Sequence, residues 1–118
     1  MLTMYHNPRC SKSRKTLEIL KENGAEPVIV EYLKEPPAGS QVQRLAELLG
    51  LSVAELLRRG EDDFKQATDL PDLTDNVALA DWVAQHPKTL ERPIVVDDAH
   101  QRAVIGRPPE NVLELLGR

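Results

Sequence analysis

LTMYHNPRCSKSRKTLEILKENGAEPVIVEY, residues 2–32, predicts a strand, a loop, a helix and a second strand. Residues 2–5 form the first expected strand, and the loop at 6–9 contains Asn and Pro, which break regular structure. Residues 27–32 are rich in β-branched side chains and predict the second strand. This β-α-β order favours a parallel pair of strands joined by a right-handed crossover.

The helix between these strands begins close to the single cysteine of the chain, Cys10. Either Ser11 or Ser13 can cap its start, and it is expected to run to Asn23, with Gly24 as its stop. Cys10 is therefore expected at the mouth of the helix. There the free backbone N–H groups and the helix dipole stabilise an anion, so the thiol should ionise more readily.

The rest of the chain predicts a helical insert followed by a β-β-α order. Helices are expected at about 40–49, 52–58 and 75–85. Strands at 94–96 and 103–105 are close enough for a hairpin, and Pro108-Pro109 opens a final helix. Without a linker long enough to divide domains, residues 1–118 predict one α/β domain, a mixed four-stranded sheet with flanking helices.

Composition narrows the classes of protein to consider. The chain has 118 residues, a net charge of −4, 41% hydrophobic and 29% charged residues, which is typical of a globular domain. An acidic chain is a poor general binder of nucleic acid, and no apolar run approaches the length of a membrane span. The start, MLTMYHNPRC, lacks the pattern of a signal peptide, so a cytoplasmic location is expected.

A single cysteine excludes an internal disulfide and a Cys-rich zinc site. Residues 1–24 contain five Lys and Arg against two Asp and Glu, a balance of +3 that leaves −7 for the remainder. This positive segment favours an anion, and His6 and Asn7 add donors near Cys10. A free cysteine is often a small buried core residue, but the polar neighbours of Cys10 favour a reactive role.

The spacing around Cys10 eliminates two familiar thiol chemistries. A phosphatase-like loop needs Arg six residues after the cysteine, where this chain has Thr16. A dithiol of the thioredoxin type needs a second cysteine at position 13, where Ser13 can only donate a hydrogen bond to a thiolate. The chemistry left open is attack by a single thiolate on an oxidised or oxyanionic centre. An external thiol would then complete the cycle.

Four segments together resemble one known family. They are YHNPRCSKSR at 5–14, LLR at 56–58, ERPIVV at 91–96 and GRPPE at 106–110. They resemble the glutaredoxin-coupled arsenate reductase family, in particular its short, arsenate-reductase-like branch. The resemblance covers essentially the whole chain and implies a thioredoxin-like fold, with a core of about 1–35 and 90–118 and a helical insert of about 38–88.

The resemblance also implies a site and a reaction. Arsenate would be held by Arg58, Arg92 and Arg107, although Arg59 adjoins Arg58 and leaves the third position open. The Cys10 thiolate would attack arsenic, glutathione would serve as co-substrate, and glutaredoxin would restore the thiol. No bound cofactor or metal and a monomeric state are expected, and a cis peptide is implied at Arg92-Pro93. His6, Asn7 and Ser13 are expected to stabilise the thiolate or its loop. His6 would do so either as an imidazolium or by hydrogen bonding.

Two other classes of protein are alternatives. A general glutathione-linked oxidoreductase or monothiol glutaredoxin would use the same thiol, although its loop usually has Gly-Phe where this chain has Ser11-Lys12. A transcription regulator of the same family binds RNA polymerase, but it typically keeps a Cys-x-x-Cys switch that Ser13 makes impossible here. Turnover with arsenate, compared with a glutathione-disulfide substrate, discriminates among them.

Overall fold

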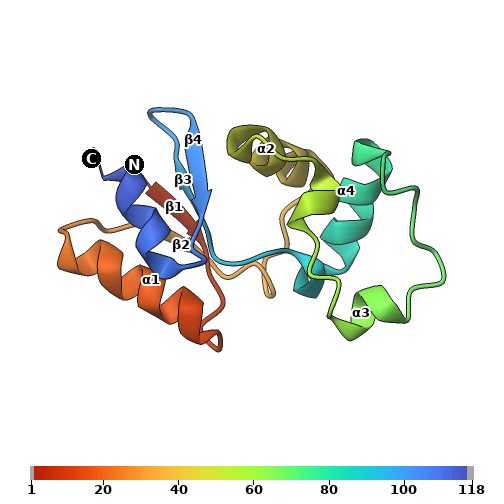
Figure 1. Ribbon diagram of the computed structural model, residues 1–118, viewed down its shortest axis with the longest axis horizontal. Helices are drawn as coiled ribbons and strands as arrows, with labels where there is room; N and C mark the ends of the chain where they lie inside the picture. The colour runs from red at the N-terminus through yellow and green to blue at the C-terminus, as the bar shows by residue number, and fades with distance from the viewer. Residues whose placement is uncertain (1, 117–118) are drawn as a thin grey trace. The chain divides into compact units, whose positions relative to one another are not determined.

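The computed structural model describes residues 2–116, and its contacts divide the chain into two compact units (Figure 1). The first unit comprises the described residues of Met1–Tyr32 and Arg92–Arg118. The second unit is Leu33–Glu91. Each unit has its own hydrogen bonds and buried side chains.

The first unit contains a four-stranded mixed sheet with the strand order β2-β1-β3-β4. Strands β1 and β2 are parallel, whereas β3 is antiparallel to both β1 and β4. The parallel β-α-β opening and the hairpin that the sequence predicted are therefore confirmed. The strands are β1 Leu2–Tyr5, β2 Val28–Val30, β3 Ile94–Asp97 and β4 Arg102–Ile105.

The core of this unit lies between the sheet and two helical segments, α1 (Ser11–Glu22) and η3 (Pro109–Leu115), which pack against each other (Figure 1). Met4 of β1 and Val95 of β3 are register partners and are fully buried in one cluster. This cluster is aliphatic, in keeping with the low aromatic content of 3%. It anchors the strand ends and helix starts that carry the candidate site. The buried cluster consists of Met4, Ile19, Leu20, Val95, Val112 and Leu115.

Helix α1 begins one residue earlier than a serine cap would place it. Cys10, in extended backbone conformation, is the N-cap residue, so the prediction of Ser11 or Ser13 as the cap was wrong. Ser11 is the first helical residue, and Ser13 is fully buried in the first turn. The helix ends before Gly24, whose φ of +81° lies in the left-handed region that glycine adopts without strain.

The second unit is built from helices, as predicted, but with different bounds. The expected helix at 52–58 is only a short 3-10 turn, because the chain turns extended at Leu57. There Leu57 bridges Leu90 in antiparallel fashion, and this pairing uses the backbone groups a longer helix would need. Two short helices, α3 and η2, were not predicted. The elements are α2 Gly39–Leu49, η1 Val53–Leu56, α3 Asp62–Lys65, α4 Asn76–Gln85 and η2 Pro87–Thr89.

Helices α2 and α4 form the main packing interface of the second unit. Each contributes buried apolar side chains to it, including Leu45 from α2 and Leu79 from α4. Trp82 is 4% exposed and belongs to the core of this unit, and its indole N–H donates to Asp69 Oδ1 at 3.1 Å. A Cβ at Gly39 would meet the Asp81 side chain and lie 3.3 Å from the Asp81 Cα, so glycine lets α2 begin close to α4 without displacing Asp81.

The last helical segment, η3, is a 3-10 helix rather than an α-helix. Its two leading prolines have no N–H to donate, and the Asn111 N–H donates to the Pro108 carbonyl at 3.0 Å, an i to i+3 bond. Cis peptide bonds precede Pro93 and Pro108, so the cis peptide expected at Arg92-Pro93 is present. Among the described residues, no helix is long and apolar enough to cross a membrane.

Candidate active site

The loop before α1 holds Cys10 through hydrogen bonds that involve its own backbone. The Cys10 N–H donates to the Asn7 carbonyl at 3.0 Å, and the Asn7 side-chain carbonyl accepts from the Arg9 N–H at 3.0 Å. The Arg14 guanidinium donates to the Pro8 carbonyl at 3.0 Å, which ties the loop to the helix it precedes. Asn7 therefore shapes the loop, and Cys10 remains partly exposed at the helix start.

His6 and Ser13 meet beneath this loop. His6 Nδ1 lies 2.6 Å from Ser13 Oγ, and the same hydroxyl accepts from the Asn7 N–H at 3.1 Å. Both side chains are buried, and burial, the largest influence, lowers the pKa of His6 even though Glu31 opposes it. This direction favours the neutral imidazole over the imidazolium. The geometry favours the alternative in which His6 orders the loop by hydrogen bonding.

Arg92 and the start of α1 together lower the pKa of Cys10. Burial on its own raises the pKa of the thiol. Three hydrogen bonds and the charge of Arg92 lower it by more than burial raises it, so the net pKa is below the ordinary value. The three donors are the backbone N–H of Ser13, the Arg92 side chain and the backbone N–H of Lys12. Ser13 therefore acts on the thiolate through its backbone, while its hydroxyl is engaged by His6 and Asn7.

Arg107 approaches the same thiol from the turn after β4. Its Nη2 lies 3.9 Å from Cys10 Sγ, and its Nε donates to the Arg92 carbonyl at 2.7 Å. Arg92 and Arg107 thus bring two permanent positive charges to one sulfur atom at a helix N-terminus. Guanidinium groups offer paired donors that match the oxygens of a tetrahedral oxyanion, so this arrangement can both ionise the thiol and bind its anionic target.

We expect Cys10 to titrate below the ordinary value for cysteine, about 8.5. The N–H groups of α1 and Arg92 stabilise the thiolate, so its fraction should rise at lower pH than in a free thiol. The rate of iodoacetamide alkylation, measured across pH and followed by mass spectrometry, gives the midpoint. The matched measurement on Arg92→Ala should shift the midpoint upward. A midpoint at or above 8.5 in the unmodified chain contradicts this expectation.

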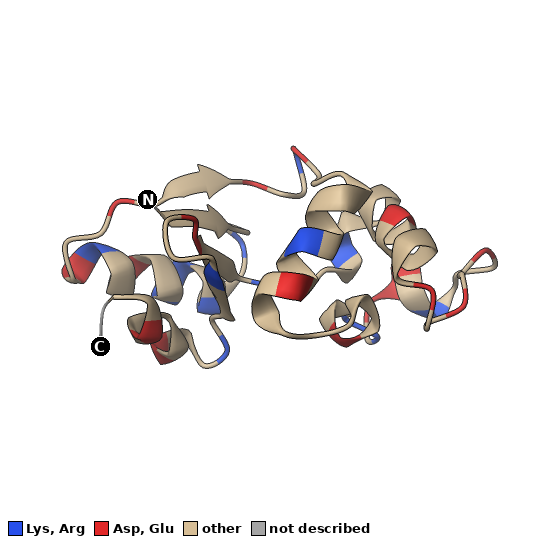
Figure 2. Ribbon diagram, turned by 90° about the horizontal axis from the view of Figure 1, so that it is seen from above, with Lys and Arg blue, Asp and Glu red and all other residues tan. Residues whose placement is uncertain are grey.

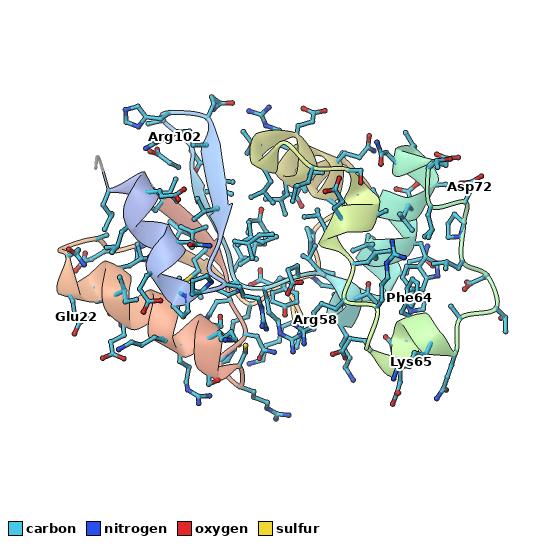
Figure 3. All side chains as sticks on the ribbon, in the orientation of Figure 1. Glu22, Arg58, Phe64, Lys65, Asp72 and Arg102 are labelled. Atoms are coloured by element: carbon cyan, nitrogen blue, oxygen red, sulfur yellow. The ribbon has the colours of Figure 1, made fainter. Side chains whose placement is uncertain are left out.

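The third arginine expected from the resemblance, Arg58, belongs to the second unit and follows η1 (labelled in Figure 3). Its Nη1 lies 3.2 Å from Glu91 Oε1, and its Nε lies 3.5 Å from Glu61 Oε2. The Arg59 guanidinium instead lies over the Phe64 ring, 5.8 Å from its centroid. The assignment of Arg58 to the substrate stays a prediction.

Sequence reasoning missed two residues of the first unit that shape the site. Tyr32 is fully buried and interacts with Arg92, so it supports the guanidinium that faces the thiol. Gly106 lets the turn before Arg107 touch α1, because a Cβ there would lie 2.5 Å from Thr16 Oγ1 and 2.8 Å from Pro93 Cγ. The glycine beside Arg107 was a readable signal in the sequence, whereas Tyr32 looked like an ordinary strand residue.

Charge is distributed unevenly along the chain (Figure 2). The segment Leu33–Glu91 has six Lys and Arg against eleven Asp and Glu, a balance of −5. The remaining residues have nine against eight, a balance of +1. Within residues 2–116, no group of three or more His, Cys, Asp or Glu side chains is arranged to hold a metal ion.

A lone cysteine at the first helix of a β2-β1-β3-β4 sheet, with a hairpin and a final helix after an insert, defines an α/β protein with the thioredoxin-like fold. A match to the ArsC family spans residues 5–115. The chain belongs to the ArsC family.

The alignments with the following three relatives cover nearly the whole length of both chains. YfgD, an uncharacterised protein of Escherichia coli (strain K12), is 48% identical over 115 residues, 97% of this chain and 95% of that protein. An arsenate reductase of Neisseria meningitidis serogroup A is 44% identical over 117 residues, 98% of this chain and 97% of that protein. The structure of an arsenate reductase from Vibrio cholerae aligns with a TM-score of 0.84 and 41% identity, covering 96% and 95% of the two chains.

Proposed function

We propose that this protein reduces arsenate to arsenite with Cys10 as the nucleophile and glutathione and glutaredoxin as external reductants. The observation that carries the proposal is one thiol at the N-cap of α1, hydrogen-bonded by Arg92 and 3.9 Å from Arg107 Nη2. Membership of the ArsC family, which includes relatives named arsenate reductases, supports arsenate as the oxyanion.

In the first step, the Cys10 thiolate attacks arsenic(V), an As–S bond forms, and one arsenate oxygen leaves as water after protonation. Arg92 and Arg107 bind the remaining oxygens and balance the negative charge that the two anions bring together. Glutathione sulfur then attacks Cys10 sulfur. The As–S bond breaks, its electron pair reduces arsenic to arsenic(III), and a Cys10–glutathione disulfide remains.

In the last step, a glutaredoxin thiolate attacks the glutathione sulfur of this mixed disulfide and releases the Cys10 thiolate. External thiols are needed because the chain has one cysteine and cannot form an internal disulfide. Arg58 is proposed as a third ligand of the substrate oxygens, and Asn7, His6 and Ser13 as residues that hold the thiolate loop. We further propose that the protein works as a monomer in the cytoplasm, without a bound cofactor.

The test is turnover by the purified protein with arsenate, glutathione, glutaredoxin, glutathione reductase and NADPH, followed as NADPH oxidation and as arsenite formed. Arsenite production that requires both thiols supports the proposal. A parallel assay omits glutaredoxin and replaces arsenate with a mixed disulfide of glutathione and a small thiol, because glutaredoxin reduces such disulfides itself. Activity on the disulfide without any on arsenate would identify a general glutathione-linked oxidoreductase instead.

We expect the cycle to leave at most one glutathione on the protein, at Cys10. Only one thiol can accept it, because no other cysteine exists in the sequence. Intact-mass spectrometry after turnover without glutaredoxin should show a single adduct, and peptide mapping should place it on Cys10. Adding glutaredoxin should remove the adduct. Efficient turnover with thioredoxin alone, without a small thiol, contradicts this route.

A further inference from the structure

One side chain holds both ends of the turn that carries Arg107. Asn111 Nδ2 donates to the Ile105 carbonyl at 3.2 Å and to the Arg107 carbonyl at 3.1 Å. The Arg107 N–H donates to the same Ile105 carbonyl at 2.9 Å, which closes a three-residue turn around Gly106. A single amide group therefore binds the two carbonyls that flank the centre of the turn.

The turn is also held from its other side. The Gly106 N–H donates to the Pro93 carbonyl at 2.9 Å, and the backbone of Gly106 lies too close to Thr16 to admit a Cβ. The backbone of the turn is therefore packed closely against α1. Asn111 adds to this hold through its bonds to the two carbonyls.

Asn111 is itself fixed by η3. Its own N–H donates to the Pro108 carbonyl at 3.0 Å, and its neighbour Val112 is fully buried in the core of the first unit. A rigid path thus leads from the core through Asn111 to the backbone of Arg107. At its end, the Arg107 guanidinium lies 3.9 Å from Cys10 Sγ.

We propose that Asn111 is a positioning residue that fixes Arg107 against the Cys10 thiol. This inference rests on the proposed oxyanion chemistry of Cys10 and Arg107, because Asn111 itself contacts neither the sulfur nor the Arg107 side chain in the bonds that hold it. Asn111 acts on the thiol and on a bound oxyanion only through the place it gives to Arg107.

The experiment is a double-mutant cycle of Asn111→Leu, which keeps a similar volume without a donor, and Arg107→Ala. Two properties are measured: the pH midpoint of Cys10 alkylation and the phosphate concentration that protects Cys10 from alkylation. Asn111→Leu alone should raise the midpoint by about half a pH unit and the protecting concentration about two- to tenfold. In the Arg107→Ala background the same change should alter neither property, because the group through which Asn111 acts is gone.

Asn23→Leu is the matched control, because Asn23 Nδ2 also donates to a backbone carbonyl, Ile19 O at 2.8 Å, but at the far end of α1. It should leave both properties unchanged. Asn111→Ala repeats the test with a smaller side chain, in case leucine disturbs the turn by its shape. Circular dichroism and melting temperature confirm that each variant folds.

An unchanged midpoint in folded Asn111→Leu and Asn111→Ala overturns the inference, as does an equal shift in the Arg107→Ala background. If phosphate gives no protection even to the unmodified chain, the proposed oxyanion site fails. The midpoint series still decides the role of Asn111 in that case, because it needs no substrate.

Discussion

Replacing Cys10 with serine should abolish arsenate turnover while leaving the fold intact. A hydroxyl is close in size to a thiol, but at neutral pH it is a far weaker nucleophile and forms no disulfide with glutathione. Cys10 is partly exposed and lies outside the buried cluster of its unit, so its loss removes little packing. Arsenite formation and far-ultraviolet circular dichroism, measured on the same preparation, check both halves of this expectation.

Ser11→Ala is the matched control for this replacement. Ser11 is the adjacent exposed residue and the first of α1, so its change tests whether any substitution at the helix start impairs turnover. We expect its rate to stay close to that of the unmodified chain. Measurable turnover by folded Cys10→Ser would show that the reaction does not need the thiol and would contradict the proposed mechanism.

Replacing either Arg92 or Arg107 with alanine should lower kcat/KM for arsenate about ten- to hundredfold. Each guanidinium supplies charge-assisted hydrogen bonds worth roughly 1.5–3 kcal/mol to an oxyanion. Arg92 additionally lowers the pKa of the thiol, so its loss should also reduce the thiolate available at neutral pH. Steady-state kinetics with circular dichroism on each variant measure the effect, and phosphate or sulfate should compete with arsenate.

The type of substitution separates charge from geometry in this series. Lysine at 92 or 107 keeps the positive charge but loses the planar pair of donors, so it should recover only part of the activity. Arg102→Ala is the matched control, since Arg102 is an exposed arginine of the same unit that lies 3.8 Å from Asp97 in the hairpin (Figure 3). Normal kcat/KM in both Arg92→Ala and Arg107→Ala contradicts the oxyanion role.

The same kinetic series tests the remaining arginine. Arg58→Ala should behave like the other two substitutions if Arg58 binds substrate, and Arg59→Ala should be nearly silent. In the structure Arg58 is paired with Glu91 and Glu61, whereas Arg59 lies over Phe64. Loss of activity in Arg59→Ala but not in Arg58→Ala would exchange the two assignments.

Local sequence signals predicted the elements of the first unit well and those of the second unit less exactly. The strands and α1 were confirmed. Their signals, which are β-branched runs, Asn-Pro and Gly24, determine backbone conformation within a few residues of their own positions. The helix expected at 52–58 was wrong beyond Leu56, because Leu57 pairs with Leu90, 33 positions further along the chain. Tertiary pairing of this kind overrides local helix propensity.

Local signals in the chain were enough to predict one thiol at the mouth of a helix in a basic segment, framed by a β-α-β unit and a hairpin. They also showed that no second cysteine can complete a redox cycle. The distances and hydrogen bonds between that thiol and its neighbours follow only from the packing of distant segments. Arg107 is 97 positions from Cys10, and the antiparallel pairing of β3 with β1 and β4 brings it and Arg92 there. Packing also makes Cys10 the N-cap residue of α1 and pairs the Ser13 hydroxyl with His6. Buried polar groups form hydrogen bonds with the partners that packing places beside them.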